Sequence, residues 1–213
     1  MVEIARSVAI PLEHALPAHS EETPLILELQ AGSEEAFAYL MAVYRNPVYN
    51  MVYHIMGDES DAADVLQNVF VKIIRGIKQF REGSSLKTWI YRIAVHEALN
   101  YRRSWFRRHR REVFSLDENE HEQTAGETQS GRGPESPFEL LEQQEKRDFV
   151  RKALRTLAEP YRTVVVLREI ENLSYEEIGE VLGVAEGTVK SRLKRGRELL
   201  RRKLMGYSAV WNY

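Results

Sequence analysis

Apolar residues recur along this chain at three- and four-residue intervals, the spacing of amphipathic helices. In the amino-terminal half, no run of alternating apolar and polar residues predicts a strand. Glycines and prolines punctuate the pattern and mark where helices begin and end. The predicted helices of this half run from Pro24 to Gly32, from Ser33 to Gly57 with a kink or interruption at Pro47, over 61–77 and over 86–105.

The carboxy-terminal half ends in two short helices joined by a tight turn. Ser174 and Glu177 have the three-residue spacing of a capping box, and Gly183 then breaks the helix where a left-handed cap would lie. A second helix follows from about Ala185, with apolar residues near helical spacing that include Val189. This arrangement predicts a helix-turn-helix.

The segment between the two halves has a different composition. From Val113 to Glu145, nine acidic residues stand against one arginine, and few residues are apolar. This composition predicts a flexible linker over 112–137, with the role of a tether or of a polyanion lying in a basic channel. We therefore predict an all-α protein of two small helical domains, at 24–111 and 138–206, with flexible tails at 1–23 and 207–213.

Positive charge concentrates in two places, although the net charge is only -2. The last helix carries cations and short polar side chains, as a recognition helix in the DNA groove does. The alternative is an ordinary basic, solvated helix, but the capping box and the turn glycine favour DNA binding. The residues predicted to contact DNA here are Thr188, Lys190, Ser191, Arg192, Lys194 and Arg195.

The second basic cluster lies at the end of the first domain, where cations alternate with aromatic residues. Rings that stack on bases beside cations that track phosphates suit single-stranded nucleic acid. The alternatives that stay open are an acidic partner surface or a solvated helix end for the cluster, and a place in the core for its aromatic residues and for Trp89. The cluster comprises Arg102, Arg103, Arg107, Arg108, Arg110 and Arg111, with Trp105 and Phe106 among them.

Several classes of function are disfavoured. The chain has no cysteine, which excludes disulfides, thiolate zinc sites and a cysteine nucleophile. The sequence contains no phosphate-binding glycine loop and no histidine pair at metal spacing. We therefore expect no enzymatic activity, no cofactor and no small-molecule substrate. No apolar run approaches the length of a membrane span or of a signal peptide, so we expect a cytoplasmic protein without membrane insertion.

Three stretches resemble bacterial sigma factors. Residues 64–72, DVLQNVFVK, resemble the conserved helix of region 2, and 88–94, TWIYRIA, resemble its promoter-melting segment. Residues 173–178, LSYEEI, and 186–193, EGTVKSRL, are similar to region 4. With only these two regions and a short linker, the chain resembles an extracytoplasmic-function (ECF, group 4) factor of the sigma-70 family, a DNA-binding subunit for transcription initiation.

The resemblance implies partners and residue roles. Core RNA polymerase would bind through its β′ clamp coiled coil and its β flap, promoter DNA would be the ligand, and an anti-sigma factor would regulate the chain. The last helix would read the −35 element. The clamp would contact Asp64, Gln67 and Phe70. The −10 element and its melted strand would contact Phe80, Lys87, Trp89, Arg92, Asn100 and Arg103.

The sequence departs from the family pattern at two positions. Asn68 stands where the family commonly has a carboxylate, and Ala185 stands where proline is common. The alternative function is a stand-alone helix-turn-helix transcriptional regulator. That alternative leaves the basic aromatic cluster unexplained and predicts DNA binding without polymerase.

Overall fold

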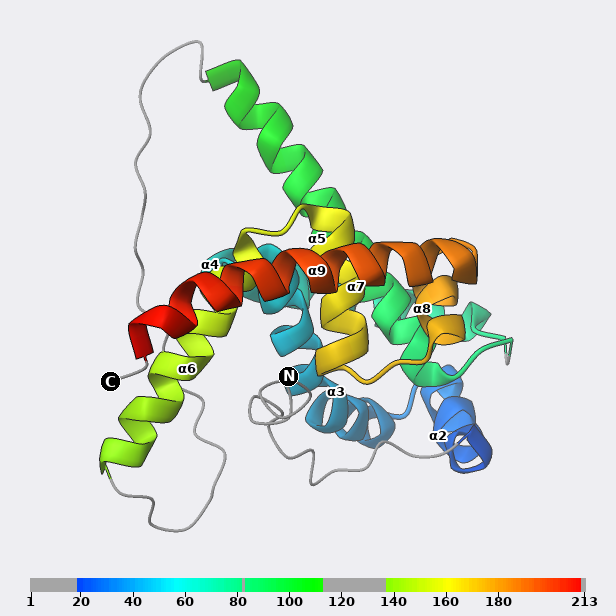
Figure 1. Cartoon of the computed structure of the whole chain (residues 1–213). Helices are drawn as coiled ribbons and strands as arrows, with labels where there is room; N and C mark the ends of the chain where they lie inside the picture. Colours follow the sequence, from blue (N-terminus) through cyan, green and yellow to red (C-terminus); the bar gives the residue numbers. More distant parts are fainter. Residues whose placement is uncertain (1–18, 82, 113–136, 212–213) are drawn as a thin grey trace.

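The computed structural model describes residues 19–81, 83–112 and 137–211, and within these ranges every regular element is a helix. Two helical units follow one another along the chain (Figure 1). The first comprises α2 (His19–Ala31), α3 (Glu34–Met56), α4 (Glu59–Gly76), the short 3-10 turn η1 (Ile77–Gln79) and α5 (Leu86–Glu112). The second comprises α6 (Pro137–Arg155), α7 (Glu159–Val165), the π-helical turn η2 (Val166–Ile170), α8 (Tyr175–Leu182) and α9 (Glu186–Trp211).

The helix ends of the first unit follow the predicted capping chemistry. The Ser33 side chain accepts a hydrogen bond from the Ala36 amide at 3.2 Å, and α3 ends at Gly57 in the left-handed conformation, with φ 83°. Asp58 then caps α4 by accepting from the Asp61 amide at 2.9 Å. Each cap satisfies an amide that the helix itself leaves unpaired.

The structure differs from the sequence pattern at two prolines. The first helix begins at His19, so Pro24 lies inside α2 and does not start it. A tertiary contact orders this extra turn, because the buried Glu22 carboxylate accepts from the Leu86 amide at the start of α5, at 2.9 Å. Pro47 does not interrupt α3, which continues through it to Met56. Buried side chains on both sides of Pro47 pack into the core, and this packing offsets the lost backbone hydrogen bond.

Two helices are longer than their sequence patterns predict. The helix α5 continues past the predicted end at Trp105 to Glu112, and α9 continues past Leu204 to Trp211, into the segment predicted as a tail. The predicted linker at 112–137 lies mainly outside the described residues, as does most of the tail at 1–23. No helix in the described part of the chain is both long and apolar enough to cross a bilayer.

The second unit has the predicted helix-turn-helix. Ser174 and Glu177 form a reciprocal capping box, with bonds of 3.1 and 2.7 Å. Gly183 ends α8 in the left-handed conformation, with φ 64°. The next helix, α9, lies across α7, and Gly196 makes the close approach possible (Figure 1). A Cβ at Gly196 would lie 2.8 Å from Val165 Cγ2 and 3.2 Å from the Tyr161 carbonyl oxygen.

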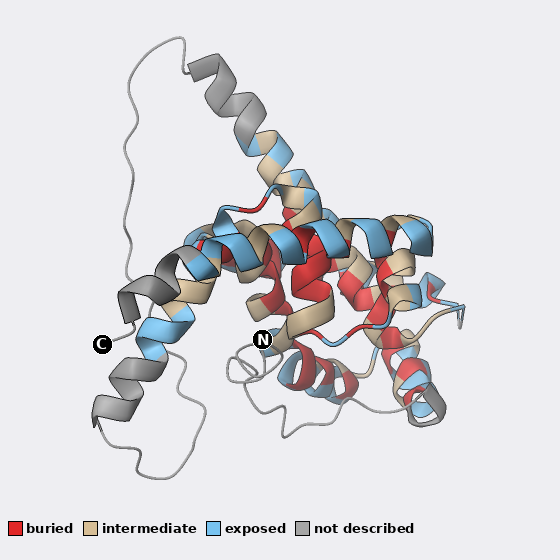
Figure 2. Ribbon diagram, viewed as in Figure 1, coloured by how far each residue is buried: buried red, intermediate tan, exposed pale blue. Residues whose placement is uncertain are grey.

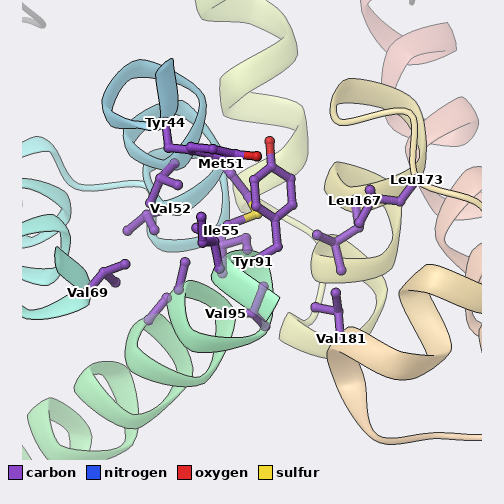
Figure 3. Packing of buried hydrophobic residues seen from close by; sticks show 14 of the residues in the cluster. Tyr44, Met51, Val52, Ile55, Val69, Tyr91, Val95, Leu167, Leu173 and Val181 are labelled. Carbon is purple, nitrogen blue, oxygen red and sulfur yellow. The ribbon is translucent and has the colours of Figure 1, made fainter. Parts of the chain in front are cut away.

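The two units share one hydrophobic core, a relationship that the sequence pattern leaves open. Tyr91 and Val95 of α5 lie against apolar side chains of the second unit, including Leu167 and Val181 (Figure 3). Buried residues continue from α3 and α5 into α7 without a solvent-exposed boundary (Figure 2). The second unit therefore packs directly against the first.

Candidate functional site

The exposed face of α9 presents most of the residues predicted to contact DNA. Val189 and Leu193 are buried beneath the helix and fix its orientation. On the outer surface, exposed cations alternate with small polar groups, as a groove-reading helix requires. Lys190, Ser191, Lys194 and Arg195 are exposed, whereas Thr188 and Arg192 are half-buried.

Short ion pairs within α9 leave these cations accessible. Lys190 Nζ lies 2.7 Å from Glu186 Oε1, and this hydrogen bond raises the pKa of Lys190. Arg195 lies 3.5 Å from Glu198. Exposed pairs of this kind contribute little to stability, so phosphate or base contacts can replace them at small cost.

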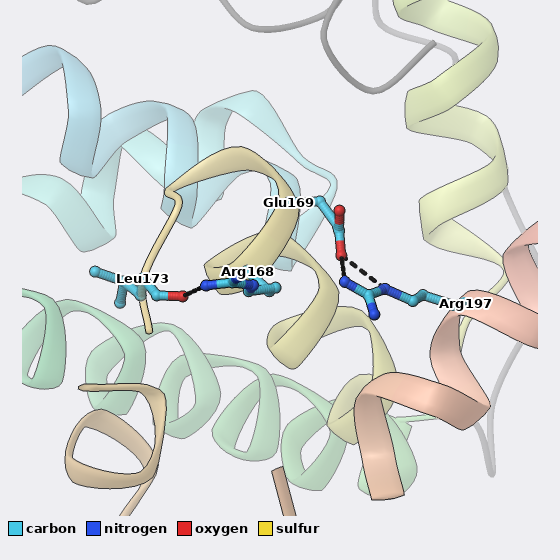
Figure 4. A network of polar contacts seen from close by, with 4 residues as sticks. All are labelled: Arg168, Glu169, Leu173 and Arg197. Atoms are coloured by element: carbon cyan, nitrogen blue, oxygen red, sulfur yellow. Dashed lines mark hydrogen bonds and ion pairs between the residues drawn. The ribbon is translucent and has the colours of Figure 1, made fainter. Parts of the chain in front are cut away.

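Arg197 of α9 forms an ion pair with a neighbouring element of the second unit. Arg197 donates through Nε and Nη2 to Glu169 Oε1 of η2, at 2.8 and 2.6 Å (Figure 4). Beside this pair, Arg168 Nη1 donates to the Leu173 carbonyl oxygen at 2.6 Å. The first contact holds α9 to η2, and the second holds η2 to the connection that precedes α8. We therefore assign Arg197 to the support of the helix-turn-helix.

A groove of about 370 Å³ runs along the same surface. The Tyr175 ring forms one wall, with Lys190 Nζ 5.8 Å from the ring centroid. Positively charged side chains surround an apolar floor, an arrangement that suits a polyanion with flat or apolar groups. The lining residues are Tyr175, Lys190, Leu193, Lys194, Arg197, Glu198 and Arg201.

The second predicted surface follows α5, where the structure divides the residues into two groups. The Phe80 ring is buried and packs against Trp89 with the ring centroids 5.1 Å apart. Phe80 is therefore core and supports Trp89, which is half-buried. Further along α5, Asn100 and Arg103 are exposed. The side chains of 106–112, which include four arginines of the basic cluster, lie outside the described residues.

The remaining two residues of this surface contact the second unit. Lys87 Nζ lies 3.5 Å from the Glu171 carbonyl oxygen and 5.4 Å from the centroid of the Tyr91 ring. Arg92 Nε donates to the Glu180 carbonyl oxygen at 3.1 Å. Both cations are half-buried. The second unit thus covers part of the face that the sequence assigns to DNA.

The third predicted surface lies on α4. Asp64 and Gln67 are exposed, but Phe70 is only 6% exposed and belongs to the core. The residues predicted from the sequence to contact the clamp include neither Val71 nor Ile74. These residues are 43% and 48% exposed. The spacing of residues 64, 67, 71 and 74 puts all four on one stripe of the helix surface. Val71 could have been found from the sequence, because it is apolar but lies outside the buried row of residues 65, 69 and 73.

No cluster of three or more potential metal ligands occurs among the described residues.

Comparison with protein families decides between the two functions considered. The model for sigma-70 region 2 matches residues 40–112, and the model for sigma-70 region 4 matches residues 150–200. The ECF RNA polymerase sigma-E factor of Haemophilus influenzae is 34% identical over 180 residues, which cover 84% of this chain and 93% of the relative. Its counterpart in Escherichia coli K12 is also 34% identical, over 84% of this chain and 92% of the relative.

The chain belongs to the sigma-70 family of RNA polymerase sigma factors, in the ECF group. As a sigma factor it directs promoter-specific initiation by RNA polymerase. The stand-alone regulator is not favoured, because the region 2 match covers the first unit. The first unit, α2 to α5, is hereafter the region 2 unit, and the second, α6 to α9, is the region 4 unit.

Two solved structures share the fold of this sigma factor. CnrH in complex with the cytosolic domain of CnrY has a TM-score of 0.60 and 22% identity, covering 86% of this chain and 96% of CnrH. The sigma factor RpoE in complex with the anti-sigma factor NepR, from Bartonella quintana, has a TM-score of 0.62 and 23% identity. It covers 79% of this chain and 96% of RpoE.

Proposed function

We propose that this sigma factor divides promoter recognition between α9 and α5. The observation that carries the proposal is the separation of faces on α9, with Val189 and Leu193 buried and Lys190, Lys194 and Arg195 exposed. Lysine and arginine can donate to guanine edges in the major groove, and the Ser191 hydroxyl suits several bases. This face reads the −35 element, with Thr188 and Arg192 positioned to support it.

Residues of α5 read the −10 element and hold its melted strand. Lys87, Arg92 and Arg103 supply charge for phosphates, Trp89 supplies a ring edge, and Asn100 supplies an amide. Extruding a base costs a few kcal/mol, which stacking and hydrogen bonds in such a site can offset. Phe80 acts beneath this surface as the support of Trp89.

The α4 stripe of Asp64, Gln67, Val71 and Ile74 binds the β′ clamp coiled coil of core polymerase. It combines a carboxylate, an amide and two exposed apolar side chains, the mixture expected of a protein interface. Phe70 stabilises the helix from within. The region 4 unit contacts the β flap. Titration of purified polymerase with the chain and with its α4 variants tests this assignment.

Regulation, location and domain boundaries complete the proposal. RpoE of Bartonella quintana is in complex with an anti-sigma factor, and we infer that an anti-sigma factor also binds this chain. The protein acts in the cytoplasm without an enzymatic activity of its own. Its domains are region 2 at 24–111 and region 4 at 138–206, with a linker at 112–137.

Run-off transcription from purified core polymerase and genomic DNA fragments, with this chain as the specificity factor, tests the proposal. We expect discrete transcripts that start at defined sites and that disappear when the chain is omitted. A chain that binds DNA but directs no initiation in the presence of bound polymerase would contradict it. A chain with Lys203→Ala, an exposed change on α9 outside the reading face, is the control variant and should give the same transcripts.

A further inference from the structure

The helix α2 belongs to none of the surfaces assigned to DNA or to polymerase. It precedes residues 40–112, which match the family model for region 2. Ile26 and Leu29 anchor it in the core, with exposed fractions of 6% and 0%. It also packs against η1 and α5, the elements that lead from α4 to the proposed −10 face. The polar side chains of α2 at this contact therefore influence the geometry of that face.

Gln30, near the end of α2, holds the turn that follows α4. Its Nε2 donates to the Ile77 carbonyl oxygen at 3.3 Å and to the Phe80 carbonyl oxygen at 3.1 Å, across 47 and 50 residues of sequence. A side-chain amide has two N–H donors, so both bonds can form at once. The Phe80 amide in turn donates to the Ile77 carbonyl oxygen at 3.0 Å. Both polar groups of the Phe80 backbone are therefore paired.

Glu22, near the start of α2, holds the first turn of α5. Its carboxylate is 2% exposed and accepts from the amide of Leu86, the first residue of α5, at 2.9 Å. The first amides of a helix have no partner within the helix and carry partial positive charge, so a carboxylate there is stabilising. Ser85 Oγ completes the cap by accepting from the Thr88 amide at 3.0 Å. The first turn of α5 is consequently attached to α2.

Trp89 lies where these two attachments meet. Its ring packs against the Phe80 ring with the centroids 5.1 Å apart, and its amide donates to the Ser85 carbonyl oxygen at 3.0 Å. The ring also lies close to Gly76, where an added Cβ would be 3.3 Å from Trp89 Cζ2. Trp89 thus has a defined position while it stays half-buried. One attachment acts on the ring through Phe80, and the other acts through the first turn of α5.

We propose that α2 is a positioning element for strand separation, in which Gln30 and Glu22 hold Trp89 in the orientation that stacks on an unpaired −10 base. The inference rests on the proposed role of Trp89 at the −10 element. A ring that is already immobile loses little freedom when it stacks on a base, so more of the stacking energy contributes to binding. Glu22 is buried and acts through the protein, without contact to DNA.

Trp89 fluorescence tests the positioning in the absence of DNA. Trp105→Phe and Trp211→Phe leave Trp89 as the single tryptophan of the full chain. Gln30→Leu removes both N–H donors and should enlarge the fast component of the Trp89 anisotropy decay, which reports motion of the ring. Glu28→Ala removes an exposed acid from the same helix and should leave the decay unchanged. A ring as immobile in Gln30→Leu as in the parent chain would overturn the proposal.

A double-mutant cycle tests the consequence for DNA. The probe is a single-stranded oligonucleotide with the non-template −10 sequence of a promoter mapped by run-off transcription, titrated against the chain bound to core polymerase. Trp89→Ala should weaken binding roughly 5- to 150-fold, the range for loss of stacking on one base. Gln30→Leu should weaken it roughly 3- to 30-fold in the parent chain but add little to Trp89→Ala, because residues that act as a unit are not additive. Full additivity would show that Gln30 supports the fold without positioning Trp89.

Variants of Glu22 test the second attachment in the same titration. Glu22→Gln keeps an oxygen that can accept from the Leu86 amide and should retain the oligonucleotide affinity of the parent chain within a few fold. Glu22→Ala leaves that amide unpaired and should weaken binding as Gln30→Leu does. Circular dichroism and co-elution with polymerase verify that both variants are folded. Equal affinities of the two variants would remove Glu22 from the positioning element.

The outcomes distinguish failure of the inference from failure of the proposed function. If Trp89→Ala leaves the oligonucleotide affinity unchanged, the proposed role of Trp89 at the −10 element fails, and the inference fails with it. If Trp89→Ala weakens binding while Gln30→Leu neither mobilises the ring nor lowers the affinity, only the inference fails.

Discussion

The hydroxyl of Tyr91 in α5 donates to the carboxylate of Glu171, 2.7 Å away in the region 4 unit. Burial raises the pKa of Glu171 to about 7, while the Tyr91 hydrogen bond and the nearby Lys87 ammonium act in the opposite direction. We therefore expect the contact between the two units to depend on pH near neutrality. The protonated carboxyl is favoured where the two units are in contact, and the ionised one where Glu171 faces water.

Raising the pH should separate the two units of the free chain, which are in contact in its closed state and apart in its open state. Because the pKa of Glu171 is about 7 when buried and lies near its ordinary 4.5 when exposed, the closed state holds one more proton between these values. Its stabilisation is complete below the ordinary pKa and is lost as the pH rises through about 7. The closed-to-open ratio should fall up to roughly tenfold per pH unit between pH 5 and 7. Energy transfer between dyes on Ala42→Cys of α3 and Lys203→Cys of α9, both exposed positions, measures this ratio.

Glu171→Gln is the control for this pH dependence, because its side chain cannot titrate. Tyr91 and Lys87 face Glu171 from α5, and burial raises the pKa of Tyr91 well above its ordinary value, so its hydroxyl stays protonated over this range. His54 of α3 contributes separately to the pH dependence of stability. Burial lowers the pKa of His54, so the stability that its neutral ring provides is lost as the pH falls. A glutamine variant that opens with rising pH as steeply as the parent chain would rule out Glu171 as the sensor.

Removing a cation from the reading face of α9 should weaken −35 recognition. Lys194→Ala or Arg195→Ala is expected to cost about 1–3 kcal/mol at the cognate site and to relax the base preference there. Binding is measured on cognate and scrambled duplexes over a range of salt, with Lys203→Ala as the control. Equal losses on both duplexes would instead assign these side chains to phosphates.

Changes on the α4 stripe should weaken binding to core polymerase. Asp64→Ala and Ile74→Ala are each expected to cost about 1–2 kcal/mol of binding energy, because each removes an exposed side chain without disturbing the core. Titration of labelled chain with polymerase measures the loss. Glu28→Ala removes an exposed acid from α2 and should have no effect. Full affinity in both α4 variants would move the interface elsewhere.

Gly196→Ala should destabilise the region 4 unit. The added methyl group would lie 2.8 Å from Val165 Cγ2 and 3.2 Å from the Tyr161 carbonyl oxygen, so α9 would have to move away from α7. Overpacking of this kind costs about 1–3 kcal/mol. Gly187→Ala, in the same helix, meets nothing within 4 Å and should stabilise by up to about 1 kcal/mol. Chemical denaturation of both variants measures the difference, and equal stabilities would contradict the packing argument.

Local chemistry made much of the fold predictable. The caps at Ser33, Asp58 and Ser174, and the left-handed glycines Gly57 and Gly183, depend on neighbouring residues alone. The sequence therefore placed most helix boundaries within a few residues. It failed at His19–Pro24, where the contact from Glu22 to the distant Leu86 amide orders the turn.

The exposure of the predicted site residues could be anticipated where charge marks them. Lys190, Lys194 and Arg195 were expected on the outer face of α9 from their spacing against the apolar residues, and they are exposed. Phe70 and Phe80 were misplaced, since an aromatic ring suits both a core and a stacking surface until its neighbours are known. The contact of region 4 with α5 was not predictable, because it joins residues 80 or more positions apart that share no sequence motif.

The close packing of α9 against α7 at Gly196 has a consequence for engineering. Packing residues such as Leu193 and Gly196 occupy one side of the helix, and Lys190, Lys194 and Arg195 occupy another. Replacement of the outer residues leaves the packing of α9 against α7 intact. With α9 in its proposed role as the −35 reader, promoter choice becomes a modular property of this chain, and new specificities can be grafted onto α9 without redesign of the fold.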